Sequence, residues 1–117
     1  MAGLGDVLRS LAARDGVQAA LLLSREGLPI EHATNGAFEP EAVAALAATL
    51  AQYAGRLGEG AARGELRMAV LDFANGLVVL ARAGTEDWLA ILARPEADIG
   101  PLLYDLRQHR PALAGLL

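Results

Sequence analysis

Hydrophobic residues repeat at helical spacing between Phe38 and Gly64, and this long stretch dominates the pattern of the chain. Glu39-Pro40 marks its start, because proline suits the first position of a helix. At 100° per residue, two apolar stripes run along the predicted helix. One stripe carries most of the larger side chains, and we expect it to pack onto a sheet: Val43, Leu46, Ala47, Leu50, Tyr53, Ala54 and Leu57.

The second stripe of this helix consists of small residues only: Ala44, Ala48, Ala51 and Gly55. A helix surface that faces water normally carries charged side chains, whereas small residues let another backbone approach closely. One interpretation is that alanine, a strong helix former, is simply abundant in this chain. The alternative is that the helix is buried on two sides, by its own sheet and by another helix that a second copy of the chain could supply.

Shorter segments on both sides give a predicted order of helix, two strands, helix, three strands and helix. The first helix begins near Leu4 and ends at Asp15-Gly16, and the last begins at Asp98, a suitable N-cap, and stops before Pro111. The predicted strands cover residues 17–24, 28–33, 66–73, 77–82 and 88–93. The pattern therefore predicts an α+β fold.

Two features of the predicted strands indicate where they lie in the sheet. Pro29 cannot donate a hydrogen bond to a neighbouring strand, so the strand that contains it should form an edge. The strand that opens with Trp88 is nearly all apolar and should be central, with Trp88 in the core. Asn75-Gly76 is a strong signal for a hairpin between the third and fourth strands.

The composition points to association with another protein. A chain of 117 residues is the size of one domain, residues 1–117. Hydrophobic residues make up 54% of it, and together with the 13 glycines they exceed the roughly 45–50% of an average domain. Because so small a monomer cannot bury all of this surface, we expect self-association or a partner.

Charge and cysteine content exclude several classes of function. The net charge is −4 without a run of basic residues, so neither nucleic acid nor an anionic membrane is an expected partner. No cysteine is present, which excludes disulfides and thiolate chemistry. The N-terminal segment lacks the pattern of a signal peptide, and apolar runs such as Ala19 to Leu23 are far too short to span a membrane. We therefore expect a cytoplasmic protein.

Catalytic and ligand-binding residues are few in this sequence. Ser24, His32 and Asp72 include the residue types of a catalytic triad, but no nucleophile motif surrounds Ser24. The histidines, His32 and His109, lie in different elements, which does not favour a metal site. We expect turn or cap roles for the remaining acidic candidates, Glu86, Asp87 and Asp98.

A phosphate-binding loop is not expected either. Gly58, Gly60 and Gly64 are closely spaced, but they follow a helix instead of a strand, the reverse of a dinucleotide site. All basic residues are arginine, and a P-loop requires a lysine. We expect no cofactor, no metal and no enzymatic activity, and the chain alone should not bind nucleotide.

Two segments, together with the element order, resemble a known family. Residues 16–30 read GVQAALLLSREGLPI, and a hairpin from Met68 to Leu80 surrounds Asn75-Gly76. They resemble the Roadblock family, the dynein-light-chain-like domains whose bacterial members include MglB-type regulators. The resemblance covers essentially the whole chain, and the segment Ser-Arg-Glu-Gly-Leu-Pro-Ile is its most specific part.

The resemblance implies a fold and a mode of assembly. The fold is a five-stranded antiparallel sheet with one long helix on one face and two shorter helices on the other, in the order α-β-β-α-β-β-β-α. Members form homodimers or heterodimers through the long helix and the third strand. For this chain the implied helix contact contains Ala44, Ala48, Ala51 and Gly55, and the implied strand contact contains Leu66, Met68, Val70 and Asp72. If the third strand is the other edge of the sheet, it carries no proline and is therefore open to pairing.

The resemblance also implies a function, a regulator or scaffold for small Ras-like GTPases. Some members activate GTP hydrolysis, but no residue of this chain can be assigned as a catalytic finger. A dimeric scaffold of a motor or membrane-associated complex is therefore the alternative. A small-molecule sensor with a similar architecture is a third possibility, although no polar group marks a pocket for it.

Overall fold

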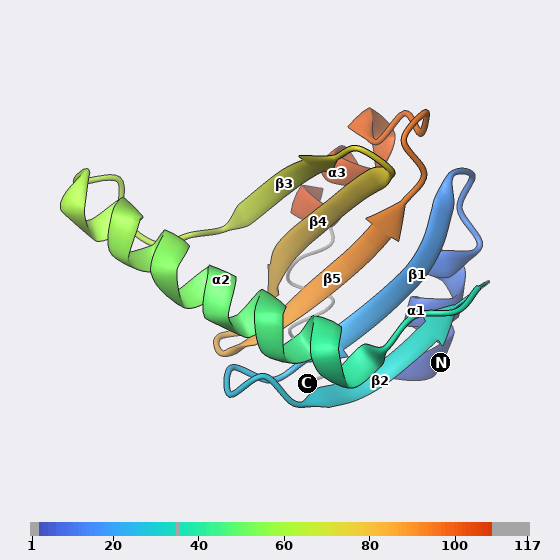
Figure 1. Ribbon diagram of the computed structural model, residues 1–117, viewed down its shortest axis with the longest axis horizontal. Helices are drawn as coiled ribbons and strands as arrows, with labels where there is room; N and C mark the ends of the chain where they lie inside the picture. The colour runs from blue at the N-terminus through green and yellow to red at the C-terminus, as the bar shows by residue number, and fades with distance from the viewer. Residues whose placement is uncertain (1–2, 35, 109–117) are drawn as a thin grey trace.

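The computed structural model describes residues 3–34 and 36–108 (Figure 1). The elements follow the predicted order, and their bounds lie close to the predicted ones. They are α1 (Leu4–Ala12), β1 (Val17–Leu23), β2 (Pro29–Thr34), α2 (Pro40–Gly60), β3 (Met68–Phe73), β4 (Gly76–Ala83), β5 (Asp87–Ala93) and α3 (Gly100–Gln108). This confirms the predicted fold class.

The five strands form one antiparallel sheet in the order β2-β1-β5-β4-β3. The expectation that the strand containing Pro29 forms an edge is confirmed, and β5 is the central strand, as predicted. β3 forms the opposite edge. Trp88, at the start of β5, is 5% exposed, which confirms its place in the core.

Helices cover both faces of this sheet. Figure 1 shows α2 crossing one face, with α1 and α3 behind the other. The core behind the sheet joins α1 and α3 to strand residues such as Leu22, Val79 and Ile91. The core in front joins α2 to a second set of strand residues: Leu21, Leu23, Leu80, Trp88 and Ala90. None of the helices within residues 3–34 and 36–108 has the length and hydrophobicity of a membrane-spanning segment.

The turn between β1 and β2 brings the backbone close to α2. Gly27 has a φ of +94°, and the Gly27 amide donates to the carbonyl of Ser24. A Cβ at this position would lie 3.1 Å from the Cα of Ala45. A larger residue would therefore both strain the turn and push α2 away from the sheet.

Glu86 lies in the turn before β5, as predicted, whereas Asp87 is already the first residue of β5, and the hairpin before β4 also differs from the prediction. Asp98 accepts a hydrogen bond from the amide of Gly100 at the start of α3, at 3.1 Å. In the hairpin between β3 and β4, Gly76 pairs with Phe73, so Ala74 and Asn75 form the loop instead of Asn75-Gly76. An added Cβ at Gly76 would lie 2.7 Å from the carbonyl oxygen of Ala93 on β5, so this position has no room for a side chain.

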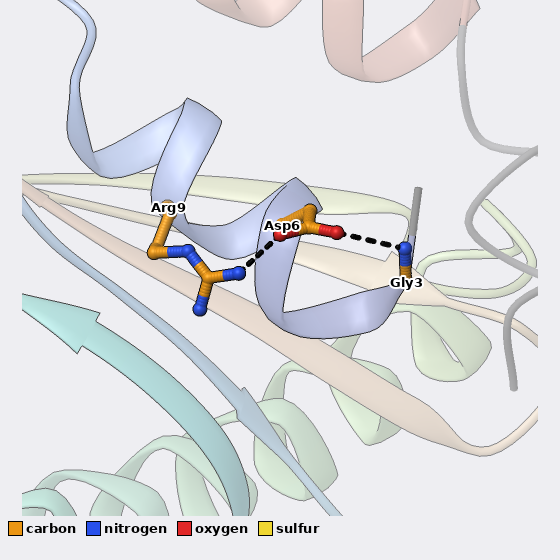
Figure 2. A network of polar contacts seen from close by, with 3 residues as sticks. All are labelled: Gly3, Asp6 and Arg9. Atoms are coloured by element: carbon orange, nitrogen blue, oxygen red, sulfur yellow. Dashed lines mark hydrogen bonds and ion pairs between the residues drawn. The ribbon is translucent and has the colours of Figure 1, made fainter. Parts of the chain in front are cut away.

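A small polar network supports the start of α1 (Figure 2). The amide of Gly3 donates to Asp6 at 3.2 Å, and Arg9 pairs with the same carboxylate from the next turn. The Gly3 hydrogen bond and then the Arg9 charge hold the pKa of Asp6 below its usual value. This cap is therefore present at neutral pH and is lost only when acid protonates Asp6.

Candidate protein interaction surface

The small-residue stripe of α2 does not face a second helix. Ala44 is fully buried within the subunit, and Ala48 and Ala51 are buried beside it against Leu23 and Trp88 of the sheet. The prediction that these three alanines lie at the contact between copies is therefore wrong. Gly55, on the same flank, is half-buried, and no atom lies within 4 Å of a Cβ built on it.

The reason lies in the sheet beneath α2. Its front face carries large side chains, including Leu21, Leu80 and Trp88, which already fill the space between the layers. A helix can pack closely on such a surface only if its own facing residues are small. The alanines therefore do let another backbone approach α2 closely, but that backbone is the sheet of the same subunit.

The larger apolar side chains of α2 point away from the sheet instead. Val43 and Ala47 pack on the core, as predicted, but the four largest members of the predicted sheet-facing stripe are exposed. They are Leu46 (70% exposed), Leu50 (37%), Tyr53 (61%) and Leu57 (73%). Their spacing of four, three and four residues forms one continuous seam, which we call the α2 seam, and this spacing is typical of helices that pair with another helix.

The C-terminal part of α2 extends beyond the sheet. Figure 1 shows its last turns projecting past β3, while its principal strand contacts are with β1, β2 and β5. The seam residue in these turns, Leu57, therefore has little of its own subunit to pack against. A single subunit leaves this end of α2 uncovered.

The outer edge of β3 is also open. The amide of Arg82 on β4 donates to the carbonyl of Arg67 at 3.0 Å. Backbone groups alternate along an antiparallel pair, so those of Met68, Val70 and Asp72 point away from β4. The family resemblance implied these three residues for the strand contact, and the structure places them on the outer edge of the sheet. The contact itself remains a prediction.

Arg82 holds the segment that leads into this edge. Its Nε donates to the carbonyl of Leu66 at 3.1 Å, and its guanidinium lies 4.5 Å from the centre of the Trp88 ring. Leu66 itself packs against the front core. β3 therefore starts from a fixed position, which a strand edge needs if it is to accept a partner in one register.

A groove of about 1300 Å³ lies where the end of α2 meets the start of β3. Apolar and small residues such as Ala54, Leu57 and Met68 line it together with four charged side chains: Arg63, Glu65, Arg67 and Arg107. None of these four has an ion-pair partner in the described part of the chain. The groove is thus an apolar recess with an excess of positive charge, next to both the α2 seam and the β3 edge.

The remaining chemical candidates do not come together. His32 lies on β2 and Asp72 on β3, at opposite edges of the sheet, so Ser24, His32 and Asp72 cannot form a triad. Ser24 accepts a hydrogen bond from the amide of Leu28, and His32 packs edge-on against Phe38 with ring centres 5.7 Å apart. In residues 3–34 and 36–108, no group of three metal-ligating side chains is found. His109 lies outside the described residues.

The glycines of α2 provide a test of these packing assignments. Gly55→Ala should raise the free energy of unfolding by about 0.5–1 kcal/mol, because alanine is the better helix former and the position has room. Gly58→Ala should lower it, since the new Cβ would lie 2.6 Å from the carbonyl oxygen of Gly64. Urea denaturation at matched protein concentration measures both. A stabilised Gly58 variant or a destabilised Gly55 variant would contradict the assignment.

Comparison with known proteins agrees with this architecture. The Roadblock/LC7 domain family matches residues 4–93. A Roadblock/LC7 domain of Streptomyces avermitilis has 28% sequence identity and a TM-score of 0.82, over 96% of this chain and 98% of that one. No curated protein sequence matches the chain.

Two MglB structures are also similar in fold. MglB of Myxococcus xanthus has 15% identity and a TM-score of 0.87, over 96% of this chain and 92% of that one. The gliding protein MglB of Thermus thermophilus has 19% identity and a TM-score of 0.86, over 99% and 93%. The family match spans the sheet, α1 and α2, which together carry the exposed surface described above. The chain belongs to the Roadblock/LC7 domain family.

Proposed function

We propose that this chain is a homodimeric, non-enzymatic regulator of a small Ras-like GTPase. The observation that carries the proposal is the exposed α2 seam beside the open β3 edge. Two such surfaces on one side of a small domain are more than a soluble monomer normally exposes. Family membership and the resemblance to MglB-type regulators support a GTPase as the partner.

The α2 seam is self-complementary if two copies of α2 pair in antiparallel orientation. Its spacing then places Leu46 beside the partner's Leu57, and Leu50 beside the partner's Tyr53, with the two-fold axis between them. Burying a leucine or similar side chain contributes about 1.5–3 kcal/mol. Eight such side chains per dimer provide enough apolar contact for a stable interface, because each copy contributes the same four residues.

The pairing leaves another flank of α2 free for the GTPase. Thr49, Gln52 and Arg56 are exposed there, and two antiparallel helices would present this flank twice across the axis. The Arg56 guanidinium lies 5.2 Å from the centre of the Tyr53 ring, so the seam and the free flank meet at this pair. A partner that contacts both α2 helices would therefore bind the dimer and not the single subunit.

A dimeric scaffold is the second candidate. It is favoured by the composition of the free flank of α2. Arg56 is the only cation of that described helix, and its guanidinium already contacts the ring of Tyr53. A surface of this kind can hold a partner without supplying a group to its reaction. In that case the dimer would bind a GTPase or another subunit without changing the rate of hydrolysis.

The test combines purified dimer with small Ras-like GTPases loaded with GTP or GDP. We expect calorimetry to show binding to one nucleotide state, and single-turnover assays to show faster hydrolysis if the dimer activates. Binding without acceleration would favour the scaffold. Absence of binding to every GTPase of the source cell, or GTP binding by the chain alone, would contradict the proposal.

A further inference from the structure

We propose that a groove beside β2 binds a positively charged, extended segment of a partner protein, which inserts an aliphatic side chain between its charged ones. The groove lies between β2 and the start of α2, and we call it the β2 groove. It is lined by residues 29–32 of the strand and residues 38–42 at the start of the helix. The β2 groove shares no residue with the α2 seam or with the groove at the end of α2, so the inference goes beyond the proposed function.

The β2 groove follows the edge of the strand. Figure 1 shows β2 at the sheet edge opposite β3, with the start of α2 close to it. Side chains of successive strand residues point to opposite faces, yet four successive residues, 29–32, line the groove. The groove therefore exposes the strand edge as well as one face. Its volume of about 760 Å³ lies within the roughly 300–1,000 Å³ of small ligand sites, so it suits a short segment.

An extended segment fits this edge because β2 has a strand neighbour on one side only in the described sheet. In an edge strand, alternate backbone groups face outward and are free to pair with another chain. Pro29 has no amide hydrogen to donate, which confines such pairing to the part of β2 after it, residues 30–34. A segment that pairs here is therefore short, and its affinity must come mainly from side-chain contacts in the groove.

Apolar side chains form the part of the groove that would hold an anchor. Ile30 of β2 is 48% exposed, and Leu28, two residues earlier, is 66% exposed. On the α2 side of the groove, Phe38 packs against the front core and meets the His32 ring edge-on, with ring centres 5.7 Å apart. Phe38 is thereby held in place, so an incoming aliphatic side chain finds a preformed apolar wall, as at the anchor position of an interface.

The charged residues that line the β2 groove are all acidic. Glu31 comes from β2, and Glu39 and Glu41 come from the start of α2. All three are exposed, and none has an ion-pair partner within the described ranges. The helix dipole accounts for acidic residues at the start of α2, but it does not account for Glu31 on the strand. Such a surface attracts a positively charged segment and repels an acidic one.

Both walls of the groove offer the same two kinds of contact. The strand contributes Ile30 and Glu31, and the helix side contributes Phe38 with Glu39 and Glu41. A segment in which arginine or lysine alternates with an aliphatic residue can use both kinds, whereas a metal ion would use only the carboxylates. No group of three side chains that could hold a metal is found in the described part of the chain. The chemistry thus favours a basic, aliphatic peptide segment.

Peptide binding to the purified chain tests the proposal. The probe is a capped, fluorescently labelled peptide of three arginine–leucine repeats, and fluorescence anisotropy measures its Kd for the natural chain. We expect saturable binding of one peptide per chain that weakens as salt is raised. Peptides with glutamate in place of arginine, or with serine in place of leucine, should each bind at least about tenfold more weakly, because they lack the charge or the anchor.

Charge variants place the site on the protein. The double variant Glu39→Gln with Glu41→Gln should raise the Kd of the arginine–leucine peptide about tenfold at low salt, because two of the groove carboxylates lose their charge. The matched control is Glu59→Gln with Glu65→Gln, which removes two exposed charges near the other end of α2 and should leave the Kd within about twofold. Equal effects of the two pairs would show a general effect of net charge and would overturn the site.

An apolar variant tests the anchor contact. Ile30→Ala should raise the Kd of the arginine–leucine peptide about fivefold or more, since it removes most of an exposed apolar side chain from the groove. Val70→Ala is the matched control, because Val70 is 45% exposed on the opposite edge strand and lies outside the groove. It should leave peptide binding unchanged.

The outcomes also distinguish the occupant of the groove. Equal binding of all three peptides, or unchanged binding to the groove variants, would overturn the proposal. If the peptide failed to bind the natural chain and the groove variants instead raised the dimer Kd in light scattering, the occupant would be a second copy and the proposal would be wrong. Peptide binding is measured without a GTPase, so its failure would leave the proposed function standing.

Discussion

Leu50→Glu should convert the proposed dimer into a folded monomer. Leu50 lies in the middle of the α2 seam, where the symmetric pairing places it beside the partner's Tyr53. The change removes two apolar contacts per dimer, at about 1.5–3 kcal/mol each, and forces two carboxylates toward an apolar interface. A loss of about 3–6 kcal/mol corresponds to a rise in Kd of roughly two to four orders of magnitude. Light scattering across a dilution series measures the shift.

The matched control for this variant is Gln52→Glu. It adds the same charge two residues further along α2, at an exposed position outside the seam, and should leave the Kd within a few-fold of its original value. Circular dichroism should show both variants folded. If Leu50→Glu remained dimeric at nanomolar concentration, or if both variants dissociated equally, the seam would not be the interface.

Much of the fold could be predicted because its signals are local. Pro29 marked an edge strand, Asp98 marked the start of α3, and the apolar run after Trp88 marked a central strand. Each of these rests on the chemistry of a few adjacent residues, which tertiary structure did not override. Hairpin geometry was less exact, because Gly76 pairs with Phe73 and so begins β4 instead of lying in the loop.

The orientation of α2 could not be predicted in the same way. Both of its flanks are apolar, so the helical pattern identified two stripes without indicating which one met the sheet. Residue size favoured the stripe with Leu46 and Leu57 for the core. The decision depends on the opposing surface, where Leu21, Leu80 and Trp88 already supply the bulk. That information lies on three separate strands and becomes available only once the sheet order is known.

This orientation separates the roles of the two stripes. The alanines set the distance between α2 and its own sheet. The exposed seam remains available to contact a partner. A change in the first stripe should therefore act on the stability of each subunit, and a change in the second should act on association. The two effects can be measured independently, because subunit stability and dimer affinity have different dependence on protein concentration.

Ala44→Leu should destabilise the subunit itself. Ala44 is fully buried between α2 and the sheet, and its carbonyl lies near the turn at Gly27, so neither side has room for three more carbon atoms. Overpacking at such a site typically costs about 1–3 kcal/mol. In a domain of this size that corresponds to a fall in Tm of roughly 4–20 °C, to be measured by calorimetry.

The paired control for this substitution is Leu46→Ala, two residues further along the helix. Leu46 is exposed in the subunit, so its truncation should leave the Tm of monomer prepared in the Leu50→Glu background almost unchanged, while it weakens association of the natural chain. In the same monomeric background, Ala44→Leu should still lower the Tm, because the overpacked contact lies within one subunit. A normal Tm for Ala44→Leu, combined with weakened association, would show that the small-residue stripe faces a second copy after all and would reverse the assignment of the two faces of α2.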